Sequence, residues 1–413
     1  NPDSRGTFTL EEAFVEFFVP IVNDAAWAYS LSFEGGYRRS KFSTAANSES
    51  YNTYKYGGEW APTESFRIRG LAQRATRAPN IAELFAPEVT GLDNLAVDPC
   101  QGASINQAQA NTPGTLSNLC RLTGVPLNVI GSLPSPSAGQ VNVLVGGEPT
   151  LQPEVADSRT VGLVWEPSFV DRLTVTLDYY DIEVTRAITS PSVDDILGDC
   201  YGVDRNPGLV FNDSCALIGR NPNNGTFNGT NAPGIVQILS NRGTLRTDGF
   251  DLAVFYGFGL GEWGDLNFAL NMNKVRGWNF QAMPGAVDRD CNGLYSISCG
   301  VLHDFKSNLR TTWSISDFQV SLAWRHLGSI REETGGFLAA YSSIPSYNYF
   351  DLGASWRATD NLRISLSVDN LFNKKPPEVG NTIAGTAINS GNSFPQYYDS
   401  IGRFMTLGAT VTF

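Results

Sequence analysis

The last twelve residues, "GRFMTLGATVTF" (Gly402–Phe413), alternate between apolar and small polar side chains. One side of the extended chain carries the apolar side chains of Met405, Leu407, Ala409, Val411 and Phe413, and the threonines lie on the other side. A strand of about 10 residues can cross the hydrocarbon core of a bilayer when it is tilted. The segment therefore predicts either a membrane-crossing strand or the last strand of a soluble sandwich.

Composition narrows the class of protein. The 413 residues carry a formal net charge of −12, and no run of Lys and Arg is present, so nucleic acid is not an expected partner. No stretch approaches about 18 consecutive apolar residues, which excludes a transmembrane helix. A membrane barrel stays possible because only alternate residues of its strands need to be apolar. The 41 glycines and 11% aromatic residues favour an all-β fold.

The six cysteines fall into three pairs that are close in sequence, each inside a segment rich in Gly, Asn and Pro. This even count and short spacing predict disulfides made in an oxidising compartment, with the pairs Cys100–Cys120, Cys200–Cys215 and Cys291–Cys299. A metal site is a weak alternative, since the chain has only two histidines and no Cys-x-x-Cys motif.

Alternation with period two recurs in about 13 segments, which predicts about 13 strands. The predicted connections alternate in length. Short connections are expected near 21–25, 61–64, 167–171, 259–265, 314–317 and 358–361, a modest one near 41–49, and long ones at 78–154, 188–234, 278–300, 329–345 and 376–400. This pattern is typical of an up-and-down barrel with tight turns at one end and long loops, which carry every cysteine, at the other. Beyond Tyr180 the alternation slips, which indicates either a bulge or the end of the apolar layer.

Aromatic residues cluster beside the short turns. The expected members of a girdle at one membrane–water boundary are Trp27, Trp60, Trp165, Trp263, Trp313, Trp356 and Phe413. A soluble sandwich gives no reason to place so many tryptophans beside one set of turns. We therefore expect a membrane barrel whose partner is outer-membrane lipid.

Four further motifs occur in order along the chain. They are "RIRGLAQRATRAPNIAELFAP" (67–87), "LQPEVADSRTVGLVWEP" (151–167), "NRGTLRTDGFDL" (241–252) and "SVDNLFNKKPP" (367–377). With the terminal Phe413, this series resembles the C-terminal barrel portion of TonB-dependent outer-membrane receptors, and "CNGLYSISCG" (291–300) is similar to the subgroup with disulfide-bearing loops.

The resemblance implies an N-terminal plug inside a barrel of about 22 strands. We therefore interpret residues 1–413 as the C-terminal portion of such a barrel, without plug, TonB-contacting box or early strands. The expected location is the bacterial outer membrane. The implied partners are the TonB complex acting through the plug, a small-molecule solute, and the outer-membrane assembly machinery, which would recognise the C-terminal strand.

No catalytic constellation emerges, so we predict neither an enzyme nor a cofactor. His303 and His326 are expected on separate strands, and no nucleophile or metalloprotease motif is present. The segment "DRDCNG" (288–293) begins like a calcium loop, but its twelfth position is Cys299 and not Glu, so no metal site is predicted.

The expected function is TonB-dependent uptake of a scarce solute: a siderophore, a vitamin or an oligosaccharide. A passive porin and a secreted β-rich carbohydrate-binding protein are the alternatives. Loop aromatics that could stack on a solute, or simply pack within loops, are Trp278, Tyr295, Tyr397 and Tyr398. Charged residues in the family motifs that could contact the plug, or form only lumenal salt bridges, are Arg74, Arg77, Glu83 and Glu154.

Overall fold

Long antiparallel strands dominate the computed structural model, which describes residues 3–296, 299–333, 342–380, 389 and 392–413. Within these residues, thirteen strands follow one another through one sheet in chain order, which confirms the expected up-and-down order and number. These strands are β1 (Thr9–Ala25), β2 (Ala28–Ser43), β3 (Ser48–Thr63), β4 (Phe66–Arg77), β7 (Glu154–Trp165), β8 (Leu173–Thr189), β11 (Ser240–Gly259), β12 (Asp265–Gln281), β16 (Phe305–Ile315), β17 (Phe318–Leu327), β20 (Tyr347–Thr359), β21 (Leu362–Asp369) and β22 (Phe404–Val411). A short strand, β13 (Arg289–Asp290), pairs with β12.

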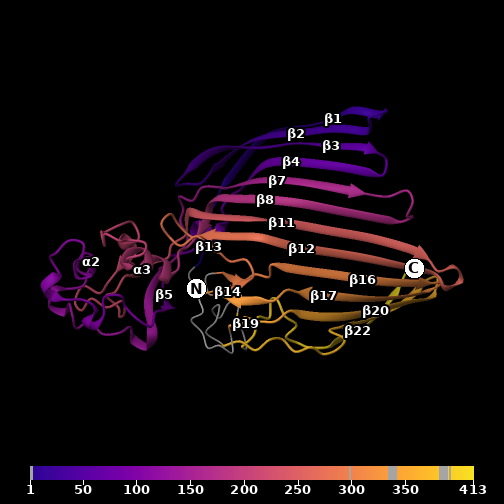
Figure 1. The fold of residues 1–413 in the computed structure, drawn as a ribbon. Coiled ribbons are helices and arrows are strands. Elements are labelled where there is room, and N and C mark those ends of the chain that lie inside the picture. The colour runs from indigo at the N-terminus through magenta and orange to yellow at the C-terminus, as the bar shows by residue number, and fades with distance from the viewer. Residues whose placement is uncertain (1–2, 297–298, 334–341, 381–388, 390–391) are drawn as a thin grey trace.

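The connections between these strands alternate in length as expected, except that the connection expected to be modest is short (44–47) and lies at the end of the long connections. The tight turns lie at 26–27, 64–65, 166–172, 260–264, 316–317 and 360–361, and the long connections at 78–153, 190–239, 282–304, 328–346 and 370–403. Figure 1 shows the turns at the right-hand end of the sheet and the long connections at the left-hand end. Each tight turn therefore lies at the opposite end of the strands from the disulfide-bearing segments.

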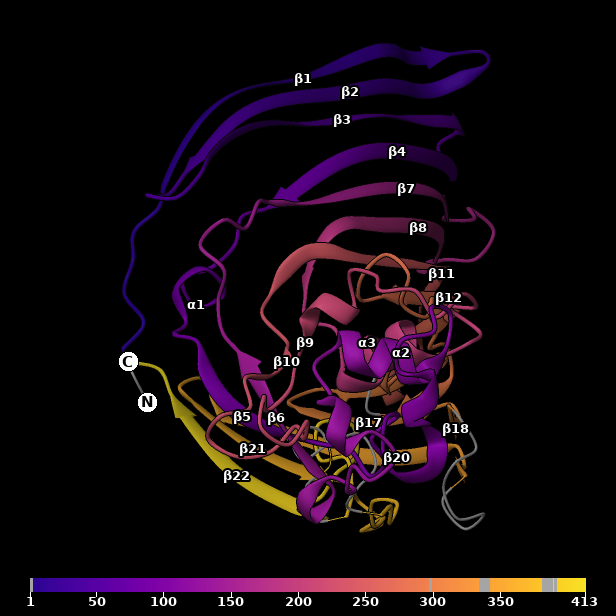
Figure 2. The same cartoon turned by 90° about the vertical axis from the view of Figure 1, so that its left-hand side faces the viewer.

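The sheet is strongly curved, and β1 and β22 are its two edges (Figure 2). Paired residues of antiparallel strands point to the same face, so the register sorts side chains between the two faces. Leu366 pairs with Leu407 and Ala354, whereas Ser365 pairs with Gly408 and Ser355. One face is thus apolar and the other polar over these strands, as the alternation predicts.

Ion pairs that skip a strand show which face lies inside the curve. Arg69 of β4 reaches Asp178 of β8 across β7, and the Arg69 Nη2 to Asp178 Oδ2 distance is 2.8 Å. Such side chains meet because curvature brings alternate strands together on the inner face. Gly162 of β7 lies between Arg69 and Asp178, where the ion pair passes over that strand. A Cβ atom at this position would lie only 1.9 Å from Asp178 Oδ1, so only glycine leaves room for the pair. The polar face is therefore the concave face, and the apolar face is the convex one.

The slip in alternation beyond Tyr180 marks the end of the apolar layer, and the register of β8 with β11 shifts only farther along the strand, between Val184 and Thr189. The pairing of β7 with β8 is continuous from Val155–Thr185 to Trp165–Val175. The convex positions continue from Tyr179 to Asp181 and Glu183, and they face charged residues on the neighbouring strands. A belt of charge thus borders the apolar band on the side of the long connections.

All seven expected girdle residues are exposed, and they lie at the turn ends of the strands. Trp60, Trp165, Trp313 and Trp356 are near strand ends, Trp27 and Trp263 lie within turns, and Phe413 follows β22. Trp313 donates a hydrogen bond from Nε1 to the carbonyl oxygen of Trp263, 2.7 Å away. Their position matches the expected girdle, and contact with lipid stays a prediction.

The two longest connections fold together into one unit, here called the large cap (78–153 and 190–239). It contains the helices α1 (Ile81–Phe85), α2 (Leu116–Leu122) and α3 (Val193–Tyr201), the 3-10 helices η1 (Gly102–Ser104), η2 (Gln107–Gln109), η3 (Leu127–Val129), η4 (Ser137–Gly139) and η5 (Cys215–Leu217), and a sheet of β5 (Val89–Asn94), β6 (Gln140–Val145), β10 (Gly234–Val236) and β9 (Ile218–Gly219). The 3-10 helix η6 (Gly261–Trp263) lies instead in a tight turn.

The large cap has its own hydrophobic core. Leu119 of α2 and Ile196 of α3 are fully buried beside Ile235 of β10. The disulfides Cys100–Cys120 and Cys200–Cys215 lie in the same core. Side chains cap the N-termini of α2 and α3. The Thr115 hydroxyl accepts a hydrogen bond from the backbone N–H of Asn118, and the Ser192 hydroxyl accepts one from the backbone N–H of Asp195. The segments that the sequence predicted as long connections therefore contain helices, strands and a packed core.

The remaining long connections form a second unit, here called the small cap (282–304, 328–346 and 370–403, in its described residues). Its sheet contains β15 (Gly300–Val301), β14 (Leu294–Ser296), β18 (Ile330–Glu332) and β19 (Ser343–Ile344). The third expected disulfide, Cys291–Cys299, lies here, so all three predicted pairs are present. Arg289 joins the two caps, because it contacts Asp195 of α3 at 2.7 Å and Glu333 at 2.8 Å. Within the described residues, no helix is both long and apolar enough to cross a membrane.

Candidate functional site

A cavity of about 440 Å³, lined by both apolar and polar groups, lies on the concave face below the small cap. Its lining comes from β8, β11, β12, β16 and β17, and Tyr397 of the small cap contributes to it. A neighbouring cavity of about 560 Å³ shares Asp178 and Asp251 with it. We call the first of these the central cavity.

The register of five strands aligns the polar side chains of the central cavity in two rows. Thr176, Ala253, Asn271, Asn308 and Arg325 are successive cross-strand partners in the first row. In the second row the successive partners are Asp178, Asp251, Asn273 and Lys306. Cross-strand partners have Cβ atoms about 5 Å apart, so the second row presents a continuous line of polar groups, and in the first row only Ala253 interrupts that line.

Several charged groups of the central cavity are already bound within the protein. Arg325 donates to Asp351 Oδ2 at 2.6 Å and to Asp399 Oδ2 at 2.8 Å, and its guanidinium lies 4.9 Å from the ring centre of Tyr349. Asp178 accepts from Arg69, as described above. Asp251 accepts one hydrogen bond, from the Asn273 amide at 2.8 Å. These contacts fix the side chains but leave Asp251 without a cationic partner among the described residues.

Other side chains of the central cavity are free to bind a solute. Over the part of the chain that the structure describes, Asn271, Asn308 and Lys306 have no side-chain hydrogen bond or ion pair within the protein. Asn271 and Asn308 are direct cross-strand partners. The cavity thus offers two amide groups, one ammonium group and one carboxylate, with the half-buried ring of Tyr397 at its edge.

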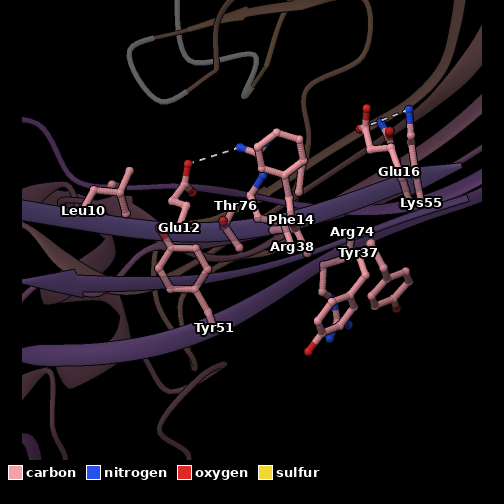
Figure 3. A pocket seen from close by; sticks show the side chains of 16 residues that line it. Leu10, Glu12, Phe14, Glu16, Tyr37, Arg38, Tyr51, Lys55, Arg74 and Thr76 are labelled. Carbon is pink, nitrogen blue, oxygen red and sulfur yellow. Dashed lines mark hydrogen bonds and ion pairs between the residues drawn. The ribbon is translucent and has the colours of Figure 1, made fainter.

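A third cavity, of about 380 Å³, lies on β1 to β4 (Figure 3). Its charges are mutually paired: Arg38 contacts Glu12 at 3.4 Å, and Lys55 contacts Glu16 at 3.4 Å. Because the two charges of each pair neutralise each other, this cavity presents fewer unpaired charged groups to a solute than the central cavity does.

The small cap packs directly above the central cavity. His303 is buried there, with its Nδ1 2.7 Å from the Gly328 carbonyl oxygen and its Nε2 3.4 Å from the Tyr398 hydroxyl. Burial lowers the pKa of His303, which favours the neutral ring. A neutral ring that donates from Nδ1 can accept a hydrogen bond from Tyr398 at Nε2. The sequence placed His303 on a strand, but it lies in the connection that precedes β16.

The sequence matches the family described as TonB dependent receptor-like, beta-barrel, over residues 13–371. The chain belongs to this family. The family consists of receptors and transporters and is not a family of enzymes. No curated protein matches the chain significantly.

Solved structures of TonB-dependent receptors share the fold of this receptor chain. The siderophore receptor PirA from Acinetobacter baumannii is 14% identical, with a TM-score of 0.56 over 98% of this chain and 46% of PirA. A variant of the ferric enterobactin receptor PfeA from Pseudomonas aeruginosa is 13% identical, with a TM-score of 0.54 over 93% of this chain and 45% of PfeA. The copper transporter OprC is 15% identical, with a TM-score of 0.54 over 98% of this chain and 48% of OprC. The receptor chain spans about half the length of these proteins.

The four aromatic residues expected to contact solute lie in different surroundings. Tyr397 lines the central cavity. Tyr295 and Tyr398 are buried in the core of the small cap, where burial raises the pKa of Tyr295 to about 12. Trp278 is not a loop residue as expected, because β12 continues to Gln281 and Trp278 pairs with Thr247. Solute binding stays a prediction for all four, and the cavity favours Tyr397.

The charged residues expected near the plug separate into two groups. Arg77 contacts Glu154 at 2.5 Å and Glu83 at 3.0 Å, and Glu83 also forms a capping box with Asn80 at the start of α1. This network joins β4, α1 and β7 within the receptor chain. Contact of Arg77, Glu83 and Glu154 with a plug stays a prediction.

Arg74 does not face the lumen, so its expected place was wrong. It shares the face of Ile68 and Trp165, and it contacts Asp157 at 2.7 Å. Figure 3 shows Arg74 and Tyr37 on the opposite side of the strands from Glu16 and Lys55. The motif suggested a lumenal role, but Arg74 is six positions after Ile68 on the same strand, an even offset, so both side chains point outward.

The sequence placed Asn271 on a polar face, but it did not identify Asn271, Asn308 or Lys306 as candidate binding residues. Period two shows which face a residue occupies, and it does not show which partners lie on strands far away in sequence. Within the described residues there is also no cluster of three or more metal-ligating side chains.

Proposed function

We propose that this chain forms part of the barrel of a receptor that takes up a small solute across the bacterial outer membrane with energy delivered by TonB. The observation that carries the proposal is the central cavity, which lies on the concave face below the ordered caps. Its free polar groups project from the concave face of the strands, and Tyr397 of the small cap contributes to its lining. Such a cavity suits capture of a solute that arrives from the side of the caps.

We further propose that residues 1–413 form the C-terminal portion of a larger barrel that encloses a plug. Two findings support this arrangement: the chain spans about half of the related receptors, and β1 and β22 are not paired with each other. An open sheet edge cannot be left in lipid, because its backbone groups would lack partners. The TonB complex would act through the plug, and the assembly machinery would recognise β22.

Conductance of the full-length protein in planar bilayers tests this proposal without knowledge of the solute. We expect a closed pore, because a plug blocks the lumen until TonB pulls on it. We also expect the purified periplasmic domain of TonB to bind the full-length protein. A steadily open channel without TonB binding would contradict the receptor proposal and support a passive porin.

A further inference from the structure

The charge balance of the central cavity limits the kind of solute that it can hold. Its charged side chains are Asp178, Asp251, Lys306 and Arg325, which sum to zero net charge. Two acidic groups already bind Arg325, and Arg69 already binds Asp178. Lys306 is thus the one cation of the cavity without a partner among the described residues. A solute with several negative charges would meet only one free cation, Lys306, together with the carboxylate of Asp251, which has no cationic partner among the described residues, and this imbalance costs binding energy.

The free neutral groups point to a solute rich in hydroxyl groups. Asn271 and Asn308 stand opposite each other, and each amide can donate and accept hydrogen bonds. Sugar hydroxyls also donate and accept, so a pair of amides complements them. Asp251 can accept from two further hydroxyls, because the Asn273 amide occupies only one of its sites.

The edge of the cavity supplies an apolar surface beside these polar groups. Tyr397 is half-buried, and its ring centre lies 6.4 Å from that of His303, which holds it against the small cap. An aromatic ring held in place can pack against the apolar face of a sugar ring. The opposed amides, the free ammonium group and the fixed ring thus occur together in one cavity of about 440 Å³.

We infer that the central cavity binds a short carbohydrate that carries one carboxylate group. This inference rests on the proposed uptake function and deepens it. The ammonium group of Lys306 binds the carboxylate, Asn271, Asn308 and Asp251 bind hydroxyls, and Tyr397 packs against a sugar ring. A ferric complex with several negative charges does not fit this balance.

Calorimetry on the full-length receptor tests the inference with matched pairs of ligands. Each pair is a neutral disaccharide and the same disaccharide with one terminal uronic acid, built on glucose, galactose or mannose. A trianionic ferric tris-catecholate complex is the competing probe. We expect at least one uronate to bind about tenfold more tightly than its neutral partner, the effect of one charge-assisted hydrogen bond. Absence of sugar binding, or tighter binding of the ferric complex, would overturn the inference.

Variants assign the selectivity to individual side chains. Lys306→Met should abolish the preference for the uronate, and Lys306→Arg should restore it. Asn308→Leu should weaken both ligands of a pair, and Lys375→Met, a change of an exposed lysine outside the cavity, should alter neither. An unchanged preference in Lys306→Met would overturn the role of that residue. Closed conductance and TonB binding, measured on the same preparations, show separately whether the uptake proposal holds and whether each variant is folded.

Discussion

Arg220 lies at the centre of the large cap and illustrates how single residues stabilise it. Its guanidinium contacts Asp98 at 2.6 Å and lies 3.9 Å from the ring centre of Phe227, and neither the Arg220 side chain nor the Asp98 side chain is exposed by more than 3%. A buried ion pair of this kind need not add net stability, but removal of one partner leaves a buried charge without compensation. The core of the cap therefore depends on the pair being intact.

Asp98→Asn should destabilise the large cap by about 3–5 kcal/mol, because the charge of Arg220 then stays buried without a counterion. Hydrogen exchange of the amides in α2 measures this free energy of opening. Asp213→Asn is the matched control, since its partner Arg242 forms an exposed ion pair with it. Equal effects of the two changes would contradict a special role for the buried pair.

The burial of His303 predicts that the stability of the small cap depends on pH. Burial lowers the pKa of His303 in the folded protein, so the unfolded state binds a proton more readily than the folded state does. The neutral ring contributes its full stability above the unfolded pKa of about 6.5, and this stability is lost as the pH falls below that value toward the lower folded pKa.

Hydrogen exchange in the segment around Tyr398 should therefore be faster at acidic than at neutral pH, after correction for intrinsic rates. His303→Gln should remove this difference, whereas His326→Gln should keep it, because His326 lies in β17 outside the small cap. A pH effect that persists in His303→Gln would show that another group is responsible.

At the scale of elements, each strand of the sheet presents two chemically different faces. On β21 the convex residue Leu366 lies next to the concave residue Ser365, and the register carries the same division to β20 and β22. Because neighbouring strands keep one register, a single strand suffices to test the assignment of both faces. A charged side chain is therefore expected to destabilise the barrel on the convex face, where lipid is expected, and to be tolerated on the polar concave face.

Leu366→Arg should lower the free energy of unfolding of the full-length barrel by about 2–4 kcal/mol, the cost of a charge near the bilayer midplane. Ser365→Arg, one residue away, should cost far less because it faces the polar interior. Urea unfolding in lipid vesicles provides the measurement. Similar costs for the two variants would mean that the faces are assigned incorrectly.

At the scale of the whole molecule, the two ends of the sheet differ in structure. The turns and the girdle tryptophans lie at one end, and the two caps with all three disulfides lie at the other (Figure 1). Arg289 ties the caps to each other through Asp195 and Glu333. If the uptake proposal is right, we expect the caps to face the outside of the cell and the turns to face the periplasm.

Epitope tags in the full-length protein should reveal this orientation. A tag after Asn223, at an exposed position of the large cap beside Gly225, should be labelled by antibody on intact cells. A tag after Thr359, at the turn between β20 and β21, should be labelled only after the outer membrane is permeabilised. Labelling of the second tag on intact cells would contradict the orientation and the receptor proposal with it.

The sequence by itself determined the features that depend on neighbouring residues. Period-two alternation identified the strands and their apolar faces because it follows from the geometry of a single strand. The disulfides were predictable because the partners are only 20, 15 and 8 residues apart. The tight turns were visible as short gaps between alternating runs.

Only the tertiary structure decided which distant residues meet. Asp98 and Arg220 are 122 residues apart, and no local pattern pairs them or shows that the long connections fold into caps. Motif likeness suggested that Arg74 was lumenal, whereas the pairing of β4 with its neighbours places it on the convex face. The rows of the central cavity likewise require the register of five strands at once. Each pairing fixes only adjacent strands, so the site exists only when all of them are assembled.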